Sequence, residues 1–305
     1  MSLHAAMHDA CRAVGIEPPR ATKPGVWVKC PVEGKGRGNG SGRVLLFDDG
    51  KGGIAWNWVS GAEQRFTSEG MAGSAEARAP RRDPEAERRA VQEQFEVERI
   101  CTGIVGACAP AQHPYLAAKG FPDEMGLVVE DLRPLIPNHD LGHAVARALP
   151  DGDGPWLIVP GRIGPRITTI QIIAPDGAKK NILRGKMSGA AHRIATGRET
   201  WVCEGIATAL SVRAALRLLG RSATVLSAFS AANVSKVARA NRGAVIAADN
   251  DKPLEQLGGL GTGEFYARAT GLRWLMPPAM GDFNDMHQSD GLRAVALALR
   301  GVAPT

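Results

Sequence analysis

Apolar runs alternate with amphipathic stretches along the last third of the chain. The short apolar runs suit buried strands, and the longer stretches between them place apolar residues at helical spacing. The predicted strands are 200–203, 223–226, 244–248 and 272–276, and the predicted helices are 205–219, 231–241, 261–270 and 290–300. This alternation favours an α/β domain over 199–305, with a mainly parallel sheet flanked by helices.

The first part of the chain has a different pattern, with brief strands separated by glycine-rich turns. We predict a helix over 3–14 and strands over 26–29, 43–47 and 54–58. Short strands joined by such turns are typical of a small antiparallel sheet, so residues 1–66 are predicted to form a β module. Residues 67–83 are polar, small and charged without an apolar period, which predicts a flexible linker.

The middle region, residues 84–198, mixes one amphipathic helix with short strands. Asp83 and Pro84 suit an N-cap and a first helical turn, and apolar positions then continue to Ile104. The predicted strands that follow are 156–159, 167–173 and 181–183. This region is therefore predicted to be a helical arm and an α+β subdomain, which makes the whole chain α+β with a C-terminal α/β domain.

Carboxylates follow three of the predicted strands of the C-terminal domain. Glu204 follows the first strand, Asp249 and Asp251 follow the third, and Asp282 and Asp285 follow the fourth. Open α/β sheets bind ligands outside the carboxyl ends of their strands. Oxygen ligands are those that Mg²⁺ prefers. The sequence therefore predicts Mg²⁺ or Mn²⁺ binding at this edge, with Asp249 and Asp251 as ligands of one ion and Asp282 and Asp285 as ligands of a second.

Each acidic group also has a structural interpretation. Asp249 and Asp251 could belong to a solvated loop, and Asp282 with its neighbours could cap the helix that follows. Their occurrence together at successive strand ends favours the metal site.

Composition limits the class of protein. The chain has 305 residues, of which 44% are hydrophobic and 22% charged, as in soluble globular proteins of about two domains. No apolar stretch approaches the ~20 residues that cross a bilayer, so we expect no membrane segment and a cytoplasmic location. The five cysteines are scattered without CxxC spacing, which argues against both a disulfide framework and a zinc site.

The net charge of +6 is matched by the excess in one short segment, 161–200. A basic segment near an acidic metal site suits a polyanionic substrate, whose phosphates are held by lysine and arginine. A solvated basic face is the structural alternative. The predicted substrate and nucleic-acid contacts are Lys179, Lys180, Arg184, Lys186 and Arg193.

Four sequence strings, in order, resemble the Toprim domain of topoisomerases and bacterial-type primases, and most closely the phage and plasmid primases. The strings are HPYLAAKG at 113–120, IQIIAPDG at 170–177, EGIATAL at 204–210 and DFND at 282–285, with Asp-x-Asp at 249–251 between the last two. The resemblance covers residues 110–300. It implies a Toprim fold for the C-terminal domain.

The resemblance also implies an activity. Phage-type primases are nucleotidyltransferases that make short RNA primers on single-stranded DNA with Mg²⁺, so a single-stranded template and ribonucleoside triphosphates are the expected partners. Glu204 would be the general acid or base, and Asp249 and Asp251 would complete the catalytic group. The chain has no Walker A motif, so a replicative helicase would be a separate protein.

This chain departs from the family pattern in two places. The zinc ribbon of phage primases is represented by Cys30 and its flanking residues without the other three thiols, so we expect no zinc. We expect Trp27, Trp56 and Trp58 to hold this degenerate module by packing, with stacking on unpaired bases as the alternative. Thr208 stands where the replicative bacterial primases have an aspartate.

Two other functions stay open at this point. A Toprim nuclease would use water in place of a 3′-hydroxyl on the same metals. A non-catalytic DNA-binding or replication-regulating protein would keep the fold without the reaction.

Overall fold

The computed structural model describes residues 2–35, 39–68 and 84–302. The chain divides into two compact units, one with residues 1–82 and 252–262 and the other with 83–251 and 263–305. Most of the predicted linker 67–83 and the predicted N-cap Asp83 lie outside the described residues.

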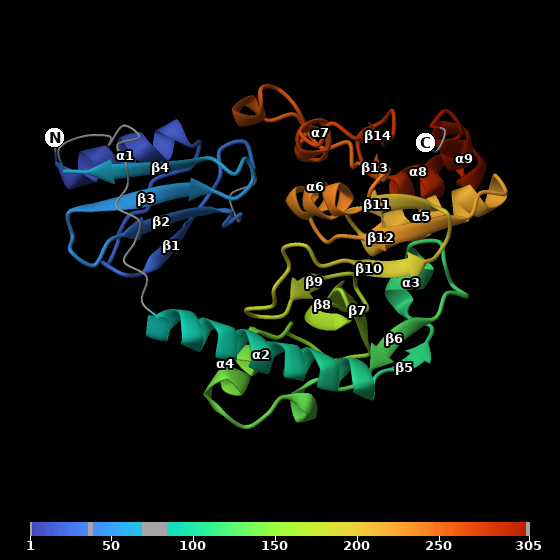
Figure 1. Cartoon of the computed structure of the whole chain (residues 1–305), viewed down its shortest axis with the longest axis horizontal. Helices are drawn as coiled ribbons and strands as arrows, with labels where there is room; N and C mark the ends of the chain where they lie inside the picture. The colour runs from blue at the N-terminus through green and yellow to red at the C-terminus, as the bar shows by residue number, and fades with distance from the viewer. Residues whose placement is uncertain (1, 36–38, 69–83, 303–305) are drawn as a thin grey trace. The chain divides into compact units, whose positions relative to one another are not determined.

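The first unit contains a helix and a four-stranded antiparallel sheet. Its elements are α1 (Leu3–Ala13), β1 (Trp27–Cys30), β2 (Gly42–Leu46), β3 (Gly52–Asn57) and β4 (Glu63–Thr67), and the strands lie in the order β1-β2-β3-β4 (Figure 1). The strand β4 was not predicted, because Phe66 is its only apolar residue. The helix α1 contacts β3 and β4, and it buries Met7 and Cys11.

The second unit begins with the middle region, which forms a five-stranded antiparallel sheet with helices. Its elements are α2 (Pro84–Ala107), β5 (Ala109–Ala111), α3 (Pro114–Ala118), β6 (Gly126–Val129), η1 (Arg133–Leu135), α4 (Asp140–Ala148), β7 (Trp156–Ile163), β8 (Arg166–Ile173) and β9 (Lys179–Asn181). The long α2 lies along this sheet, and its Ile100 and Ile104 pack with Ile170 and Ile172 of β8 (Figure 1). The predicted helix and strands are confirmed here, although the strands are longer than expected or shifted.

The C-terminal region of this unit is the predicted α/β domain. Its elements are β10 (His192–Ala195), β11 (Glu199–Cys203), α5 (Ile206–Leu218), β12 (Ala223–Ser227), α6 (Ala231–Ala240), β13 (Val245–Ala247), α7 (Thr262–Arg268), β14 (Arg273–Leu275), α8 (Phe283–Asp290) and α9 (Leu292–Arg300). The strands lie in the order β10-β12-β11-β13-β14, and all neighbours are parallel except β10, which pairs antiparallel with β12. The predicted α/β fold class is confirmed.

Helices cover both faces of this sheet, so its strands are apolar on both sides. On one face Trp201 and Val225 pack with Leu216 of α5 and Leu299 of α9. On the other face, residues of the same strands pack with α6 and α7. Strands buried on both faces explain why the sequence shows continuous apolar runs rather than alternation.

A further cluster joins the two sheets of the second unit. Tyr115 and Leu116 of α3 and Val159 of β7 pack with Ile206 and Leu210 at the start of α5. The start of α5 is therefore fixed by both halves of the unit. In the described part of the chain, no helix combines the length and apolar character needed to cross a membrane.

Candidate functional site

The acidic residues lie at the point where the order of strands reverses. The chain passes from β11 to β12 on one side and then to β13 on the other side of β11, so a crevice opens beyond the carboxyl ends of β11 and β13. Cys203 pairs with Ala247 in this parallel ladder. Glu204 and Asp249 therefore emerge close together at the switch point.

Asp249 is the most strongly perturbed carboxylate of the group. Burial, and then the charges of Glu204, Asp282, Asp251 and Asp285, raise the pKa of Asp249 to about 9. Its Oδ1 atom is buried and has no hydrogen-bond partner. This oxygen has no hydrogen-bond donor and the carboxylate has four acidic neighbours. A divalent cation bound here would stabilise the ionised form of Asp249.

Backbone hydrogen bonds hold the acidic segments against one another. The N–H of Asn250 donates to the carbonyl of Gly281 at 2.9 Å, and the N–H of Gly281 donates back at 3.0 Å. The Asn250 side chain also donates to the carbonyl of Pro277 at 2.9 Å. The segment that carries Asp249 and Asp251 is thus fixed beside the residue that precedes Asp282.

Asp282 and Asp285 cap α8, as the structural alternative predicts. One oxygen of Asp282 accepts from the N–H of Asn284 at 2.6 Å and of Asp285 at 3.0 Å, and Asp285 accepts from the N–H of Asp282 at 3.0 Å. This reciprocal pattern is a capping box. It orients both side chains, and the backbone of α8 competes with any cation for these oxygens.

The carboxylates are close enough to interact electrostatically, but their side chains are not arranged as the ligands of one metal ion. Within residues 2–35, 39–68 and 84–302, no three His, Cys, Asp or Glu side chains are grouped so that they could hold a metal ion. Asp251 is occupied as well, since its Oδ2 accepts from the N–H of Gly263 at 2.8 Å. These backbone donors engage one oxygen each of Asp251, Asp282 and Asp285, so a cation would bind through the other oxygen of each carboxylate.

A sequence model of the Toprim domain family matches residues 199–293. These residues form a Toprim domain. The match covers β11 to the start of α9, and it includes all five acidic residues of the site.

Two solved structures are similar to longer parts of the chain. One is the primase fragment of the bacteriophage T7 primase-helicase protein, at 14% identity and a TM-score of 0.40, covering 90% of this chain and 100% of that chain. The other is a bacteriophage T7 complex of lagging-strand DNA polymerase with primase domains bound to an RNA/DNA hybrid and dTTP, at 16% identity and a TM-score of 0.36, covering 49% and 79% of the two chains. Both likenesses are too weak for us to infer a function from them.

A network of buried polar side chains at the start of α8, which the sequence did not reveal, lies next to the acidic residues. Asn284 is fully buried, and its Nδ2 donates to the carbonyl of Lys119 at 2.8 Å and to Ser211 Oγ at 3.1 Å. Ser211 Oγ also lies 3.1 Å from His287 Nδ1, and burial lowers the pKa of His287. This network ties α8 to α5 and to the 113–120 segment, so it fixes the start of α8 near Asp282.

The five predicted phosphate contacts are all exposed but differ in their surroundings. Lys179 lies over the ring of Tyr115 at 5.0 Å, Lys180 donates to a backbone carbonyl at 3.0 Å, and Arg184 pairs with Glu93 at 2.7 Å. Among the described residues, the side chains of Lys186 and Arg193 make no hydrogen bond or ion pair.

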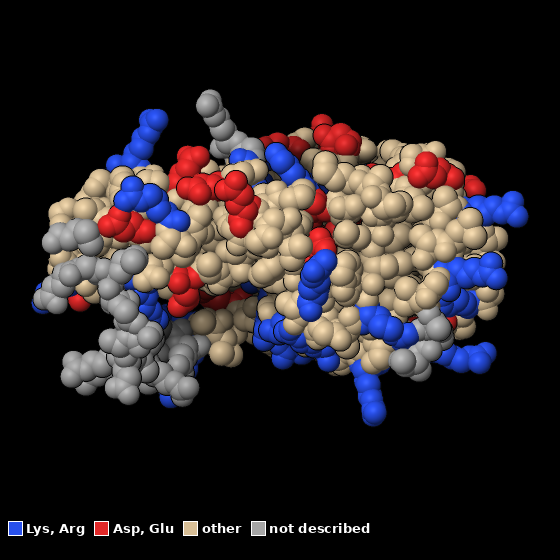
Figure 2. Space-filling model, turned by 90° about the horizontal axis from the view of Figure 1, so that it is seen from above, with Lys and Arg blue, Asp and Glu red and all other residues tan. Residues whose placement is uncertain are grey.

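Arg193 also borders two adjoining hollows, of about 330 and 890 Å³. The larger one is lined as well by Arg162, His192 and Asn241. On the face that Figure 2 shows from above, basic and acidic side chains are both present. Arg193 is therefore the predicted contact with the most suitable local shape for a phosphate group.

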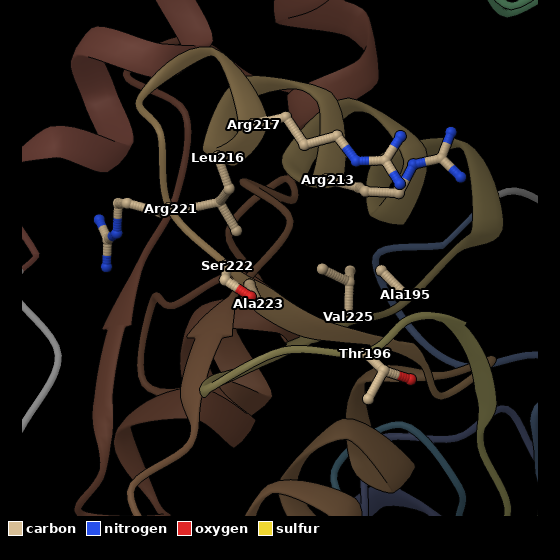
Figure 3. Close-up of a pocket in the computed structure, with 9 residues that line it drawn as sticks. All are labelled: Ala195, Thr196, Arg213, Leu216, Arg217, Arg221, Ser222, Ala223 and Val225. Atoms are coloured by element: carbon tan, nitrogen blue, oxygen red, sulfur yellow. The ribbon is translucent and has the colours of Figure 1, made fainter.

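Another hollow contains three arginines and lies away from the acidic residues. Its volume is about 230 Å³, and it is next to Ala223, at the amino end of β12 (Figure 3). Arg213 forms a two-point ion pair with Glu124, and Arg221 pairs with Glu199 and points away from Arg213. Because two of its three charges are neutralised, we interpret this hollow as structural.

The three tryptophans of the first unit lie together on the face of the sheet that α1 leaves uncovered. Trp56 stacks on Trp58 at 4.1 Å between ring centroids, and Trp27 lies 6.4 Å from Trp56. Trp27 is 45% exposed and Trp58 is 52% exposed. Arg43 is the cross-strand neighbour of Trp56, and Lys29 is that of Arg43. The aromatic residues contact one another, but they form an exposed aromatic and basic face rather than a core.

Cys30 lies on the opposite, buried face of the same sheet. It is 1% exposed, and burial raises the pKa of its thiol to about 11. Cys11 of α1 is also buried, and its pKa is raised to about 12 by burial and by its proximity to Cys30. Both are free thiols with the character of small apolar core residues.

Proposed function

We propose that this chain is a primase-type nucleotidyltransferase that makes short RNA primers on single-stranded DNA. The observation that carries the proposal is the buried, unpartnered Oδ1 of Asp249 with four acidic neighbours at the switch point of a Toprim domain. In the reaction, the 3′-oxygen of one nucleotide forms a bond to the α-phosphorus of a ribonucleoside triphosphate. The bond from that phosphorus to pyrophosphate breaks, and the hydroxyl proton passes to a base.

The proposed metal is Mg²⁺ or Mn²⁺, held by Asp249 and Asp251, with Asp282 and Asp285 as candidates for a second ion. When bound, such ions neutralise the phosphates and the charge that develops on the attacking and leaving oxygens. The unsatisfied oxygen of Asp249 fits this role, because burial and then repulsion by the neighbouring carboxylates raise the pKa of Asp249, and a bound cation would offset both effects. The capping box holds the side chains of Asp282 and Asp285 in fixed positions at the start of α8.

Glu204 is the proposed base that takes the hydroxyl proton. It stands directly after β11, in the turn that leads into α5. Its carbonyl accepts from the N–H of Phe229 at 2.7 Å and from Ser227 Oγ at 3.1 Å, so its backbone is fixed. Its charge also acts on Asp249, which supports a position close to the proposed metal ligand.

Each unit, taken by itself, has candidate substrate contacts. Lys186 and Arg193 are the candidates for contacts to triphosphate and template phosphates, because both are exposed without a side-chain partner among the described residues. The other three predicted contacts already interact with protein groups, and they are Lys179, Lys180 and Arg184. The exposed Trp27 and Trp58 could stack on unpaired bases of the template, since base stacking on aromatic rings contributes ~1–3 kcal/mol per base. A replicative helicase is the proposed partner.

The test is primer synthesis with labelled ribonucleoside triphosphates on single-stranded DNA of mixed sequence, in Mg²⁺ and in Mn²⁺. Oligoribonucleotides that require the template would support the proposal. Shortening of labelled DNA without synthesis would instead indicate a Toprim nuclease. Salt-dependent DNA binding without either reaction would indicate a non-catalytic DNA-binding protein.

A further inference from the structure

The segment that directly follows Asp251 groups with the N-terminal unit, although it lies within the residues that the Toprim family model matches. Residues 252–262 group with the first unit, and they contain the single-turn helix η2 (Glu255–Leu257). Leu254 and Leu257 are buried, and the N–H of Leu254 donates to the carbonyl of Leu260 at 3.0 Å. The segment is therefore a compact loop with an apolar side, and we call it the 252–262 loop.

Gln256 fixes this loop to the N-terminal module. Its Nε2 donates to the carbonyl of Glu33 at 2.9 Å, and its Oε1 accepts from Asn57 Nδ2 at 3.0 Å. Asn57 is fully buried at the end of β3, and it also donates to the carbonyl of Val14 at 2.7 Å and accepts from the N–H of Val59 at 2.9 Å. Both polar ends of the Gln256 side chain are thus bound by the module.

Two glycines of the module leave the space that the loop occupies. A Cβ on Gly15 would lie 2.3 Å from Gln256 Oε1, and a Cβ on Gly34 would lie 3.2 Å from Leu254 Cδ2. Both glycines also have positive φ angles, of 67° and 79°. The fit between module and loop therefore depends on the absence of side chains at these two positions.

The base of the loop is closed by the proposed metal ligand. Asp251 Oδ2 accepts from the N–H of Gly263 at 2.8 Å, which joins the residue before the loop to the residue after it. Gly263 has no room for a side chain, since its Cβ would lie 2.3 Å from the carbonyl oxygen of Asp249. The same loop is thus held at its tip by Gln256 and at its base by Asp251.

We infer that the 252–262 loop is a coupling element through which the N-terminal module positions Asp251. A loop fixed at its tip has few conformations, so its ends stay at the spacing that the hydrogen bond from Gly263 to Asp251 requires. Release of Gln256 from the module frees the loop, and Asp251 then loses its fixed orientation. Gln256 is a positioning residue in this account, and only its consequence for cation binding rests on the proposed function.

The experiment uses the full chain and perturbs the contact between Gln256 and the N-terminal module, first by a substitution in the module. Gly15→Ala places a methyl group against Gln256 Oε1, and Gly50→Ala is the matched control. Gly50 has a similar φ of 64°, but a Cβ added there would have no atom within 4 Å. Both variants carry the same kind of backbone strain, and only Gly15→Ala disturbs the loop. From the loop side, Gln256→Ala is compared with Glu255→Ala, which alters an exposed neighbour.

The first readout is hydrogen exchange at the Gly263 amide, which needs no metal and no activity. We expect a loss of protection of about 10-fold in Gly15→Ala and Gln256→Ala and no change in the two controls. The second readout is Mn²⁺ affinity, which we expect to fall by about 10-fold in the same two variants. Loss of a residue that orients a metal ligand typically weakens metal binding by about 10- to 100-fold, and this expectation is at the lower end of that range.

Unchanged Gly263 protection in a folded Gln256→Ala variant would overturn the inference, as would equal losses in Gly15→Ala and Gly50→Ala. The proposed function fails separately, if the wild-type protein binds no Mn²⁺. In that event the exchange measurement still decides whether the loop couples the module to Asp251.

Discussion

Replacement of Asp249 by asparagine should stabilise the metal-free protein. The pKa of Asp249 is raised from 3.8 to about 9, by burial first and then by the neighbouring carboxylates. At pH values between these two pKa values, the folded chain binds more protons than the unfolded chain. The free energy of unfolding therefore falls as the pH rises. Asparagine has nearly the same shape and cannot ionise, so the variant lacks this loss.

The size of the effect follows from the shift in pKa. Each unit of difference between the folded and unfolded pKa corresponds to ~1.4 kcal/mol. At pH 8 the gain should be on the order of 3–5 kcal/mol, which allows for a proton shared among the acidic neighbours. The difference between variant and wild type should widen by ~1.4 kcal/mol for each pH unit between about 6 and 8.

The assay is urea unfolding of both proteins in EDTA at pH 6 and pH 8, repeated with Mn²⁺. In EDTA, Asp249→Asn should have the higher unfolding midpoint, and more so at pH 8. With Mn²⁺ only the wild type should gain stability, because a ligand that binds the native state alone stabilises it by mass action. A variant that is less stable than the wild type at pH 8 in EDTA would show that Asp249 is ionised and satisfied without a metal, which would refute the reasoning.

Further predictions concern the base, the phosphate contacts and the zinc content. Glu204→Gln should keep Mn²⁺ affinity within about threefold and abolish primer synthesis, because a general base is worth 10²–10⁴-fold; full activity in this variant would exclude the assignment. Lys186→Glu with Arg193→Glu should weaken binding of single-stranded DNA and reduce its salt slope by about 0.7 for each lost phosphate contact, whereas the control Arg217→Glu should change neither. Identical slopes in all three proteins would place the nucleic acid elsewhere. Because Cys30 lacks companion thiols in the pattern of a zinc ribbon, elemental analysis should find no stoichiometric zinc, and one zinc per chain would contradict this interpretation.

The sequence predicted the C-terminal fold well because each strand and helix carries its own local signal. The strands are continuous apolar runs, as expected for a sheet covered on both faces. It missed several elements, among them β10 of the C-terminal sheet and β5 and β6 of the middle sheet. Two further examples are β4 of the first unit, where Phe66 is the only apolar residue, and α8, whose start appeared only as a capping alternative at Asp282. These two elements depend on a neighbouring strand and on side-chain caps, so a periodic pattern could not reveal them.

The candidate site was predictable in its residue types but not in its side-chain arrangement. Strand ends in a parallel sheet bring Glu204 and Asp249 to one edge, which is a consequence of topology. The capping of α8 by Asp282 and the hydrogen bond between Asn57 and Gln256, which are 199 positions apart, depend on tertiary structure. No local pattern distinguishes Gln256 from an ordinary loop glutamine.

The central claim is that the acidic residues of the Toprim domain support primer synthesis. The most direct measurement is incorporation of labelled ribonucleotides on single-stranded DNA of mixed sequence over a titration of Mn²⁺, for the wild type and for Asp251→Asn. The account predicts template-dependent oligoribonucleotides from the wild type alone, with product that saturates over the same Mn²⁺ range as Mn²⁺ binding. No product at any Mn²⁺ concentration, or product that Asp251→Asn does not diminish, would contradict it.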